Sequence, residues 1–458
     1  MKTMTVGQIY RAIGGRLLQG DESITLSRVC TDTRQIQKGD LFFALLGEKF
    51  DAHDFIDQAI NGGAGALVIS RKVTVPEGVP VIQVRDTLVG LQELAAYNRR
   101  QFNVPVVGIT GSSGKTTTKD MVAAILGTRY KVLKTKGNFN NEIGLPLTLL
   151  DFSDQHDVAV VEMAMRGPGE IDSLCRLARP TCAIINNIGV AHLERLGSEA
   201  NIARAKGEIL DHISPTGFAL LPGDSEPARE QASRCYGKVL YFGFDQNFDI
   251  YAEDIHPEAG GNRFTAVMGN NRCNIFLPLP GLHNVMNALA AVGTGLLLGL
   301  TPGEIEKGLA GVALSGMRTE IINQAGYTIV NDAYNANPDS AVAALQALEE
   351  LAGDRRKVAV LGDMLELGTG AVAGHLRVGA AAVRHGVKLL VTVGELAEQI
   401  AEGALQAGKN TAMQIFSCAE KPEALKVLRR ELRSGDMVLV KGSRGMRMEE
   451  IVKDLLKD

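Results

Sequence analysis

The fold of this chain is decided by Val104-Pro-Val-Val-Gly-Ile-Thr110 and the residues that follow it, Gly111-Ser-Ser-Gly-Lys-Thr-Thr117. The first part is an apolar run typical of a buried parallel strand, and the second is a glycine-rich turn. An apolar stripe from Met121 to Leu126 then predicts a helix that begins at Lys115. A strand, a glycine-rich loop and a helix in this order predict a phosphate site, because loop N–H groups and the positive helix N-terminus face the same anion.

This loop predicts ATP as a ligand. Lys115 would neutralise the β- and γ-phosphates, and the Thr116 hydroxyl would ligate Mg²⁺. The pattern is shorter than the full motif G-x-x-x-x-G-K-[ST], since Ile109 stands where the first glycine would be. A chance turn is the alternative, and the strand–loop–helix context argues against it. The predicted nucleotide-binding residues of the loop are Thr110, Gly111, Ser112, Ser113, Gly114, Lys115, Thr116 and Thr117.

Composition limits the classes of protein. With 458 residues, the length suggests about three domains. The hydrophobic share of 45%, the charged share of 22% and the net charge of −4 are typical of a globular protein without a nucleic-acid or membrane partner. The N-terminus lacks the apolar core of a signal peptide, and the six cysteines are scattered without C-x-x-C spacing. We therefore expect a cytoplasmic monomer.

The distribution of apolar runs predicts an α/β fold with three domains. Residues 1–103 predict a small α/β domain that alternates helical stripes with short strands. Residues 104–313 predict a central P-loop ATPase domain with a mostly parallel sheet, and short β-like runs between residues 217 and 279 predict an antiparallel extension. Residues 314–458 predict a Rossmann-like domain.

Polar residues follow the predicted strands of the last domain. In open α/β sheets, ligands bind outside the carboxyl ends of the strands. That rule places Asp332, Asp363 and Lys441 on one rim of the sheet. The alternative is that these residues were chosen only for turn geometry, and the sequence leaves both interpretations open.

Three further side chains could support phosphate chemistry. Glu162 closes a predicted strand, where its carboxylate would suit Mg²⁺. His192 lies just beyond the next strand, although a lone histidine is more often structural. The sequence around Lys206, taken alone, indicates a solvent-exposed lysine on a helix.

The order of motifs resembles the Mur ligase superfamily over essentially the whole chain. One departure is Ala164, which stands where the family often has glycine after Glu-Met. The central and linking blocks that carry the resemblance are the short phosphate loop, Thr135–Asn138, Asn140–Leu149, Glu162-Met163, Asn186–His192, Lys206–Glu208, Leu282–Asn287 and Gly316–Arg318.

Other blocks are similar to the superfamily members that add D-alanyl-D-alanine to a UDP-N-acetylmuramoyl tripeptide. The Asp-Asn-Pro-Arg motif of the members that add the third amino acid is missing. The similar blocks are Thr31–Arg34, Phe42–Glu48 and Asp51–Phe55 near the N-terminus, and Asn331–Ser340, Leu361–Gly368 and Val440–Arg447 near the C-terminus.

This resemblance implies ATP-dependent ligation through an acyl phosphate, with the tripeptide and the dipeptide as substrates. The implied catalytic residues are Lys115, Glu162, His192, Lys206, Arg318 and Asp332. The implied Mg²⁺ ligands are Thr116, Glu162, His192 and a carbamylated Lys206. Asn284, Asn287, Arg318 and Asp332 would contact the nucleotide, the two asparagines on its base side. Substrate binding is implied for Thr31, Asp32, Arg34, Asp51, His53, Asn138, Asn141, Asn335, Asn337, Lys441 and Ser443, the first five at the UDP-sugar.

Two other functions stay open from the sequence. Another amide ligase of the same superfamily, of the folylpolyglutamate type or the tripeptide-forming type, would share the central motifs. A regulator that binds ATP and a muropeptide without joining them is the other alternative, and the presence of Lys115, Glu162, His192 and Lys206 argues against it. Turnover of ATP with and without the dipeptide would separate an enzyme from a binding protein.

Overall fold

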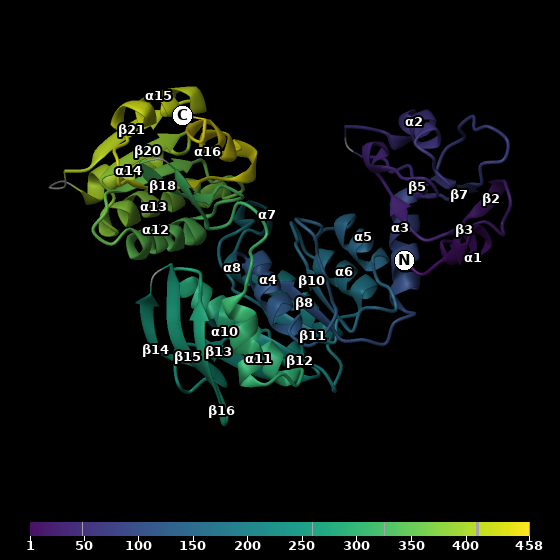
Figure 1. Cartoon of the computed structure of the whole chain (residues 1–458), viewed down its shortest axis with the longest axis horizontal. Helices are drawn as coiled ribbons and strands as arrows, with labels where there is room; N and C mark the ends of the chain where they lie inside the picture. The colour runs from purple at the N-terminus through teal and green to yellow at the C-terminus, as the bar shows by residue number, and fades with distance from the viewer. Residues whose placement is uncertain (48, 259, 325, 409–411, 458) are drawn as a thin grey trace. The chain divides into compact units, whose positions relative to one another are not determined.

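The computed structural model describes the chain except residues 48, 259, 325, 409–411 and 458. Glu48, the last residue of one of the blocks used above, lies outside the described residues. The fold is α/β with parallel-rich sheets, which confirms the predicted class (Figure 1). The helices of the described residues include none with the length and apolar character needed to cross a bilayer.

The chain folds into two compact units. The first comprises residues 1–108, 130–165 and 169–182, and the second comprises residues 109–129, 166–168 and 183–458. The boundary falls inside the strand β8 (Val106–Thr110), so the central region contributes to both units. The domain boundaries predicted after residues 103 and 313 stay predictions.

The N-terminal part of the first unit is a small α/β fold. Its five-stranded sheet, counted in the described residues, has the order β2-β7-β6-β5-β4, with parallel pairing except between β2 and β7. The expected helical stripe and strands are present. The elements are β1 (Met4–Thr5), α1 (Val6–Ala12), β2 (Arg16–Gln19), β3 (Thr25–Leu26), β4 (Val29–Cys30), β5 (Leu41–Phe43), α2 (Ile56–Asn61), β6 (Ala66–Ile69), β7 (Val81–Gln83) and α3 (Thr87–Arg99).

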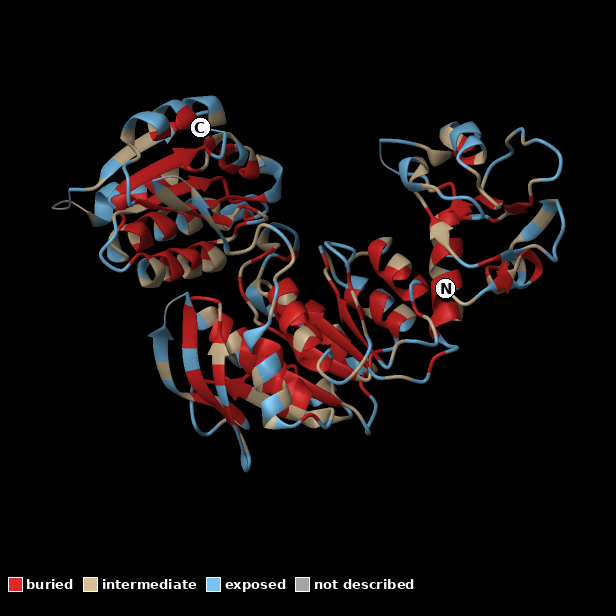
Figure 2. Cartoon of the chain, in the orientation of Figure 1, coloured by how far each residue is buried: buried red, intermediate tan, exposed pale blue. Residues whose placement is uncertain are grey.

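The largest sheet of the described residues has nine strands in the order β16-β15-β14-β13-β12-β11-β8-β10-β9. Its buried strands form continuous apolar runs, as expected for strands covered on both faces (Figure 2). Besides its part of β8, the first unit contributes the strands β9 (Val132–Lys134) and β10 (Val158–Glu162) to this sheet. The same unit contains the helices α5 (Gly144–Leu150) and α6 (Glu170–Ala178). The later strands are β11 (Cys182–Ile185), β12 (Phe218–Pro222), β13 (Lys238–Gly243), β14 (Ile250–Glu258), β15 (Gly261–Met268) and β16 (Asn271–Leu277).

The predicted antiparallel extension is present. β14 pairs antiparallel with β15, and β15 pairs antiparallel with β16. β12 and β13 remain parallel, so the change of direction comes only after β14. The helices of this part of the second unit are α4 (Lys115–Leu126), α7 (Leu193–Leu196), α8 (Glu199–Gly207), α9 (Glu226–Arg229), α10 (Leu282–Leu297) and α11 (Pro302–Ala310).

The C-terminal part has a six-stranded sheet, counted in the described residues, of order β17-β18-β22-β19-β20-β21. Helices α12, α13 and α14 pack into one buried apolar cluster with the sheet, and α15 and α16 pack into another, so both faces are covered (Figure 1). Among the strands of this described sheet, only β17 is antiparallel to its neighbour. The elements are β17 (Glu320–Gln324), β18 (Tyr327–Asp332), α12 (Pro338–Ala352), β19 (Lys357–Gly362), α13 (Ala371–Arg384), β20 (Leu389–Val393), α14 (Glu398–Ala407), β21 (Gln414–Cys418), α15 (Lys421–Glu431), β22 (Met437–Lys441) and α16 (Glu449–Leu455).

Candidate functional site

The glycine-rich loop has a backbone that only glycine fits. Gly114 precedes the first residue of α4 with φ +73°, in the left-handed region. A Cβ atom there would lie 2.3 Å from Nδ2 of Asn186 and 2.7 Å from Oδ1 of Asn287. The helix begins at Lys115, as predicted, so its first N–H groups are available to an anion.

Two asparagines after β11 hold the loop in shape. Asn187 accepts a hydrogen bond from the backbone N–H of Ser113 (2.8 Å) and donates to the Ser113 hydroxyl (2.6 Å). Asn186 accepts from the Thr118 hydroxyl (2.7 Å), and its Nδ2 donates to the Ser113 carbonyl (3.0 Å) and to Oδ1 of Asn287 (2.7 Å). Sequence reasoning did not include Asn186 or Asn187 among the site residues. Their position directly after a strand of the same sheet was the available signal.

Asn287 and Asn284 belong to the first turns of α10. Asn287 lies beside the phosphate loop through its contact with Asn186, and its Nδ2 lies 3.3 Å from Oδ1 of Asn284. Asn284 donates to the carbonyl of Pro280 (2.7 Å). The structure therefore places Asn287 against the loop that would hold phosphates, while the predicted contact of both residues with the base stays a prediction.

Three of the predicted catalytic residues, Lys115, His192 and Lys206, share one environment in the second unit. Lys115 donates to the carbonyl of Gly111 (2.7 Å), and Thr116 is buried at the start of α4. Lys206 on α8 is 1% exposed, and burial followed by the charge of Lys115 lowers its pKa well below the ordinary value. Within the described chain, the Lys206 amine has neither a hydrogen-bond partner nor a carboxylate partner.

His192 shares this environment. Its pKa is lowered by burial and then by the charges of Lys206 and Lys115, while Glu366 opposes the shift. Nδ1 of His192 lies 2.8 Å from the carboxylate of Glu366. The neutral imidazole favoured by this environment is the form that binds a metal ion. Nearby, the hydroxyl of Thr110 is buried and has no hydrogen-bond partner in the described part of the chain.

Glu162 belongs to the first unit. It ends β10, it is 2% exposed, and its Oε1 accepts a hydrogen bond from Asn140 (2.8 Å). The hydroxyl of Thr135 accepts from its backbone N–H (3.0 Å). Asn140 was missed as a site residue, although it lies next to Asn141, which was predicted. Asn141 accepts from the N–H of Gly144 at the start of α5 (2.9 Å), and Asn138 is exposed.

In the described residues, no group of three or more His, Cys, Asp or Glu side chains has a spacing suited to a metal ion. The predicted ligand set has only two members of those types, Glu162 and His192. Its other members are the hydroxyl of Thr116 and the modified Lys206. These residues therefore do not form a preformed protein cage of the zinc type, whereas Mg²⁺ is bound by one or two carboxylates together with water and phosphate oxygens.

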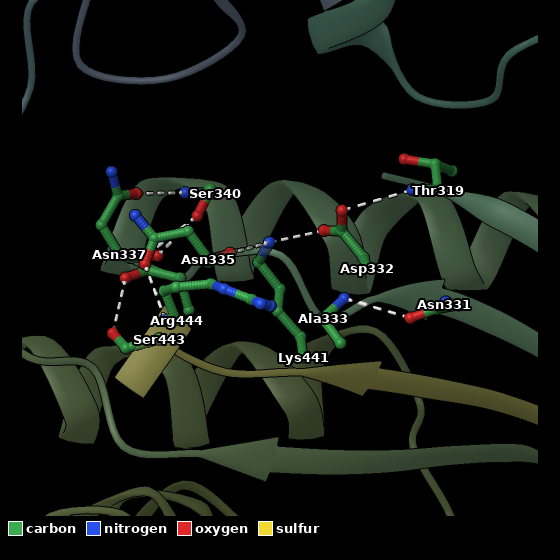
Figure 3. Close-up of polar contacts among 11 residues, drawn as sticks. Thr319, Asn331, Asp332, Ala333, Asn335, Asn337, Ser340, Lys441, Ser443 and Arg444 are labelled. Carbon is green, nitrogen blue, oxygen red and sulfur yellow. Dashed lines mark hydrogen bonds and ion pairs between the residues drawn. The ribbon is translucent and has the colours of Figure 1, made fainter. Parts of the chain in front are cut away.

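The carboxyl-end rim of the C-terminal sheet carries a polar cluster (Figure 3). Asp332 and Lys441 are opposite each other in the register of β18 and β22, and their charged atoms are 2.5 Å apart. The Lys441 amine also donates to the carbonyl of Asn335 (2.9 Å). The side chain of Asn335 accepts from the backbone N–H of Arg444 (3.3 Å), and Asp332 accepts from that of Thr319 (3.3 Å). The prediction that Asp332 and Lys441 lie on the same rim of the sheet is therefore confirmed.

Two of the predicted substrate-binding residues, Ser443 and Asn337, and the third predicted rim residue, Asp363, have structural contacts. The Ser443 hydroxyl accepts from the N–H of Leu365 (2.8 Å) and donates to the carbonyl of Ala336 (3.2 Å). Asn337 caps α12 through the N–H of Ser340 (2.8 Å). Asp363 lies on the rim, since its carbonyl accepts from the N–H of Ser443, but its carboxylate accepts from the N–H of Ala397 (2.7 Å). For Asp363 the turn interpretation describes the side chain better than a ligand-binding one.

The segment before β17 lines a cavity of about 220 Å³. The guanidinium of Arg318 lies over the ring of Tyr334, 4.2 Å from its centroid. The lining residues are Leu279, Leu314, Gly316, Met317, Arg318, Thr319 and Glu320.

The predicted UDP-sugar residues form two clusters in the N-terminal part. Asp32 pairs with Arg34 (2.7 Å), and this hydrogen bond lowers the pKa of Asp32. Asp51 lies 2.6 Å from Nδ1 of His53 and also pairs with Arg71 (3.0 Å). The other ring nitrogen of His53, Nε2, accepts from the N–H of Ser70 (2.9 Å), and His53 is only 5% exposed. His53 therefore fixes the surrounding loops, and Arg71 is a neighbour that the sequence did not indicate. Thr31 is half-buried beside the first cluster.

The whole chain is similar to known proteins of one family. Residues 25–99 match "Mur ligase family, catalytic domain", residues 109–295 match "Mur ligase middle domain", and residues 317–444 match "Mur ligase, glutamate ligase domain". Proteins named UDP-N-acetylmuramoyl-tripeptide–D-alanyl-D-alanine ligase from Bacillus subtilis and Escherichia coli are 42% and 41% identical to it. The first match covers 99% of this chain and 98% of the relative, and the second covers 99% of both.

Solved structures agree with these matches. A crystal structure of MurF from Acinetobacter baumannii is 34% identical with a TM-score of 0.90, and each chain is covered completely. A MurF ligase from Thermotoga maritima in complex with ADP is 30% identical with a TM-score of 0.82, covering 94% of this chain and 97% of that one.

Proposed function

The chain belongs to the Mur ligase family, and we propose that it joins D-alanyl-D-alanine to a UDP-N-acetylmuramoyl tripeptide at the expense of ATP. The observation that carries this function is the similarity over the full length to ligases of that name, at 42% and 41% identity. The product would be the UDP-linked pentapeptide of peptidoglycan synthesis. The ADP complex of the Thermotoga maritima relative supports the proposal that this chain binds a nucleotide.

The reaction needs activation of a carboxylate. An oxygen of the tripeptide's terminal carboxylate attacks the γ-phosphorus of ATP, and ADP leaves. The dipeptide amine then attacks the carbonyl carbon of the acyl phosphate, loses a proton, and expels inorganic phosphate as the amide forms. The protein's contribution is positioning and electrostatic stabilisation. Lys115 and the N–H groups at the start of α4 would hold the phosphates, because they supply positive charge at the glycine-rich loop.

We propose Mg²⁺ as the metal, held by Thr116, Glu162, His192 and a modified Lys206. The residues present fit this ion. Glu162 is a buried carboxylate oriented by Asn140, and His192 lies in surroundings that favour the neutral ring. When bound, the metal would neutralise charge on the phosphate oxygens.

The surroundings of Lys206 support carbamylation. A buried ammonium without a counter-ion is costly, and burial favours the neutral amine. The neutral amine is also the form that attacks carbon dioxide, giving an N-carboxylate and releasing one proton. That change converts a cation into an anion next to Lys115, which would offset the like-charge repulsion between the two lysines. The carbamate would then supply oxygen ligands to Mg²⁺.

The remaining predicted residues extend the same proposal. Arg318 and Asp332 would reach ATP from the C-terminal domain, and Asn284 and Asn287 would contact the nucleotide from α10. The peptide and dipeptide would be bound by Asn138, Asn141, Asn335, Asn337, Lys441 and Ser443. The UDP-sugar would be bound by Thr31, Asp32, Arg34, Asp51 and His53.

We also propose a cytoplasmic monomer that acts in cell-wall formation, and thereby in cell shape and cell division. The described cysteines are free thiols, which agrees with a reducing compartment. The two domain boundaries after residues 103 and 313 belong to this proposal, because the family matches are interrupted between residues 99 and 109 and between residues 295 and 317.

The decisive assay measures phosphate release from ATP and Mg²⁺ with the UDP-muramoyl tripeptide, with and without D-alanyl-D-alanine, and the product mass. Turnover that needs both substrates and yields the pentapeptide is expected. Turnover with a different acceptor would keep the family and refute this step, while ATP binding without turnover would favour a regulator. In the same assay, Lys206→Ala should be nearly inactive and partly rescued by a short carboxylate. A fully active variant would refute the carbamate.

A further inference from the structure

Tyr334, in the turn that follows β18, has its ring in contact with two arginines. The Arg318 guanidinium carbon is 4.2 Å from the centroid of the Tyr334 ring, and that of Arg444 is 5.9 Å away. Tyr334 is half-buried, and its hydroxyl makes no hydrogen bond within the described chain. Contact with Arg318 is therefore made by the aromatic face, which attracts a cation through its negative quadrupole.

The charge of Arg318 is uncompensated, unlike that of its neighbours. Arg444 pairs with Glu449 (2.8 Å), and Lys441 pairs with Asp332 (2.5 Å). In the described residues, Arg318 has no ion pair or hydrogen bond, and its contact with the Tyr334 ring is the interaction that orients it. A carboxylate partner would hold the guanidinium equally well but would compete with an anionic ligand. An aromatic ring holds it and leaves its charge available.

The backbone around Arg318 is also held in an unusual conformation. Met317 and Thr319, on either side of it, both lie in the left-handed region, with φ of 53° and 49°. The N–H of Tyr334 donates to the carbonyl of Met317 (3.3 Å), and Asp332 accepts from the N–H of Thr319 (3.3 Å; Figure 3). Such conformations persist only where the surroundings enforce them. The turn after β18 therefore fixes both the backbone and the side chain of Arg318.

We propose that Tyr334 is a positioning residue, whose ring orients the Arg318 guanidinium toward the phosphates of ATP without neutralising its charge. This inference rests on the proposed function, in which Arg318 contacts ATP. Tyr334 itself need not touch the nucleotide. The inference adds to the ligation site a residue that acts only through Arg318.

The test compares variants in the ligation assay. Tyr334→Leu should lower kcat/KM for ATP about three- to tenfold, in the range of a partly exposed cation–π contact. The KM for D-alanyl-D-alanine should stay within about twofold. Tyr334→Phe keeps the ring and should retain at least about half of the wild-type value. Replacement of Tyr334 by phenylalanines carrying one, two and three fluorines should lower log(kcat/KM) stepwise, because fluorine weakens the quadrupole with little change of shape.

A double-mutant cycle shows whether Tyr334 acts through Arg318. Addition of Tyr334→Leu to Arg318→Ala should cause no further loss, because the group it positions is already absent. Tyr236→Leu is a control at an exposed tyrosine (76% exposed) and should leave kinetics unchanged. Equal losses for the Phe and Leu variants, a flat fluorine series, or an additive loss in the double variant would each overturn the inference. An inactive wild type would instead refute the proposed function.

Discussion

Substitution of Gly114 by alanine tests whether the glycine-rich loop is the nucleotide site. Gly114 has φ +73°, and a Cβ atom would lie 2.3 Å from Nδ2 of Asn186. Asn186 cannot move away without losing hydrogen bonds, because its side chain bonds to the Thr118 hydroxyl (2.7 Å), the Ser113 carbonyl (3.0 Å) and Asn287 (2.7 Å). The substitution should therefore disturb the frame that shapes the loop.

Two contributions set the size of the effect. A residue with a Cβ in the left-handed region costs about 1–2 kcal/mol. Loss of three hydrogen bonds at about 1 kcal/mol each adds about 3 kcal/mol. The first cost affects only the stability of the fold. If the whole cost of the lost hydrogen bonds appears as weaker phosphate binding by the loop, the affinity for ADP should drop about 100-fold, since each 1.4 kcal/mol is a factor of ten.

A matched variant separates the two contributions. Gly269 lies in the turn between β15 and β16 with φ +56°, and a Cβ there would meet nothing within 4 Å. Gly269→Ala should therefore lower the unfolding temperature slightly and leave ADP binding unchanged. Isothermal calorimetry with ADP and Mg²⁺, with thermal unfolding of both variants, gives the comparison. If Gly114→Ala binds ADP as tightly as Gly269→Ala does, the loop is not the phosphate site.

Two other predictions concern His283, in the first turn of α10, and the Asp332–Lys441 pair on the C-terminal rim. Burial lowers the pKa of His283 to about 4; the unfolded chain takes up this proton near pH 6.5 and the folded chain only near pH 4, so stability is lost as the pH falls through this window. His283→Leu should flatten the fall of the urea midpoint between pH 6.5 and 4, and an unchanged slope would contradict the buried neutral ring. Asp332→Asn leaves Lys441 (3% exposed) without its carboxylate and should cost about 3–5 kcal/mol in urea unfolding. Asp332→Asn with Lys441→Met should recover most of that loss, and no recovery would show that the pair does not act as a unit.

Much of the fold could be predicted because its strands are locally encoded. The runs that end at Thr110, Glu162 and Val393 are mainly apolar, and each forms a buried strand. The start of α4 at Lys115 followed from the apolar stripe after it. The pairing of β13 with β14 was not predicted, because parallel order depends on contacts between segments that no local pattern records.

The candidate site was predictable where a residue type has one obvious use in phosphate chemistry. Lys115 and Thr116 belong to this class. Asn186 and Asn187 were not recognised as site residues, because an asparagine after a strand is also an ordinary turn residue. For Asp363 the sequence left a turn role and a ligand-binding role open: its place on the rim was correct, and its carboxylate accepts a hydrogen bond from the N–H of Ala397. Side-chain direction depends on the neighbouring loop, so it could not be read from position along a strand.

The cations of the proposed site differ in whether a carboxylate of the fold compensates their charge. Lys441 and Arg444 have carboxylate partners, and removal of either partner should destabilise the fold. Lys206 and Arg318 have none in the described residues. Lys206 is buried, so a bare charge is unfavourable there, and carbamylation would replace it by an anion suited to a metal. Arg318 is half-buried and can stay charged, so an aromatic ring suffices to orient it. The degree of burial thus explains why one cation would be modified chemically while the other would be held for the phosphates of ATP.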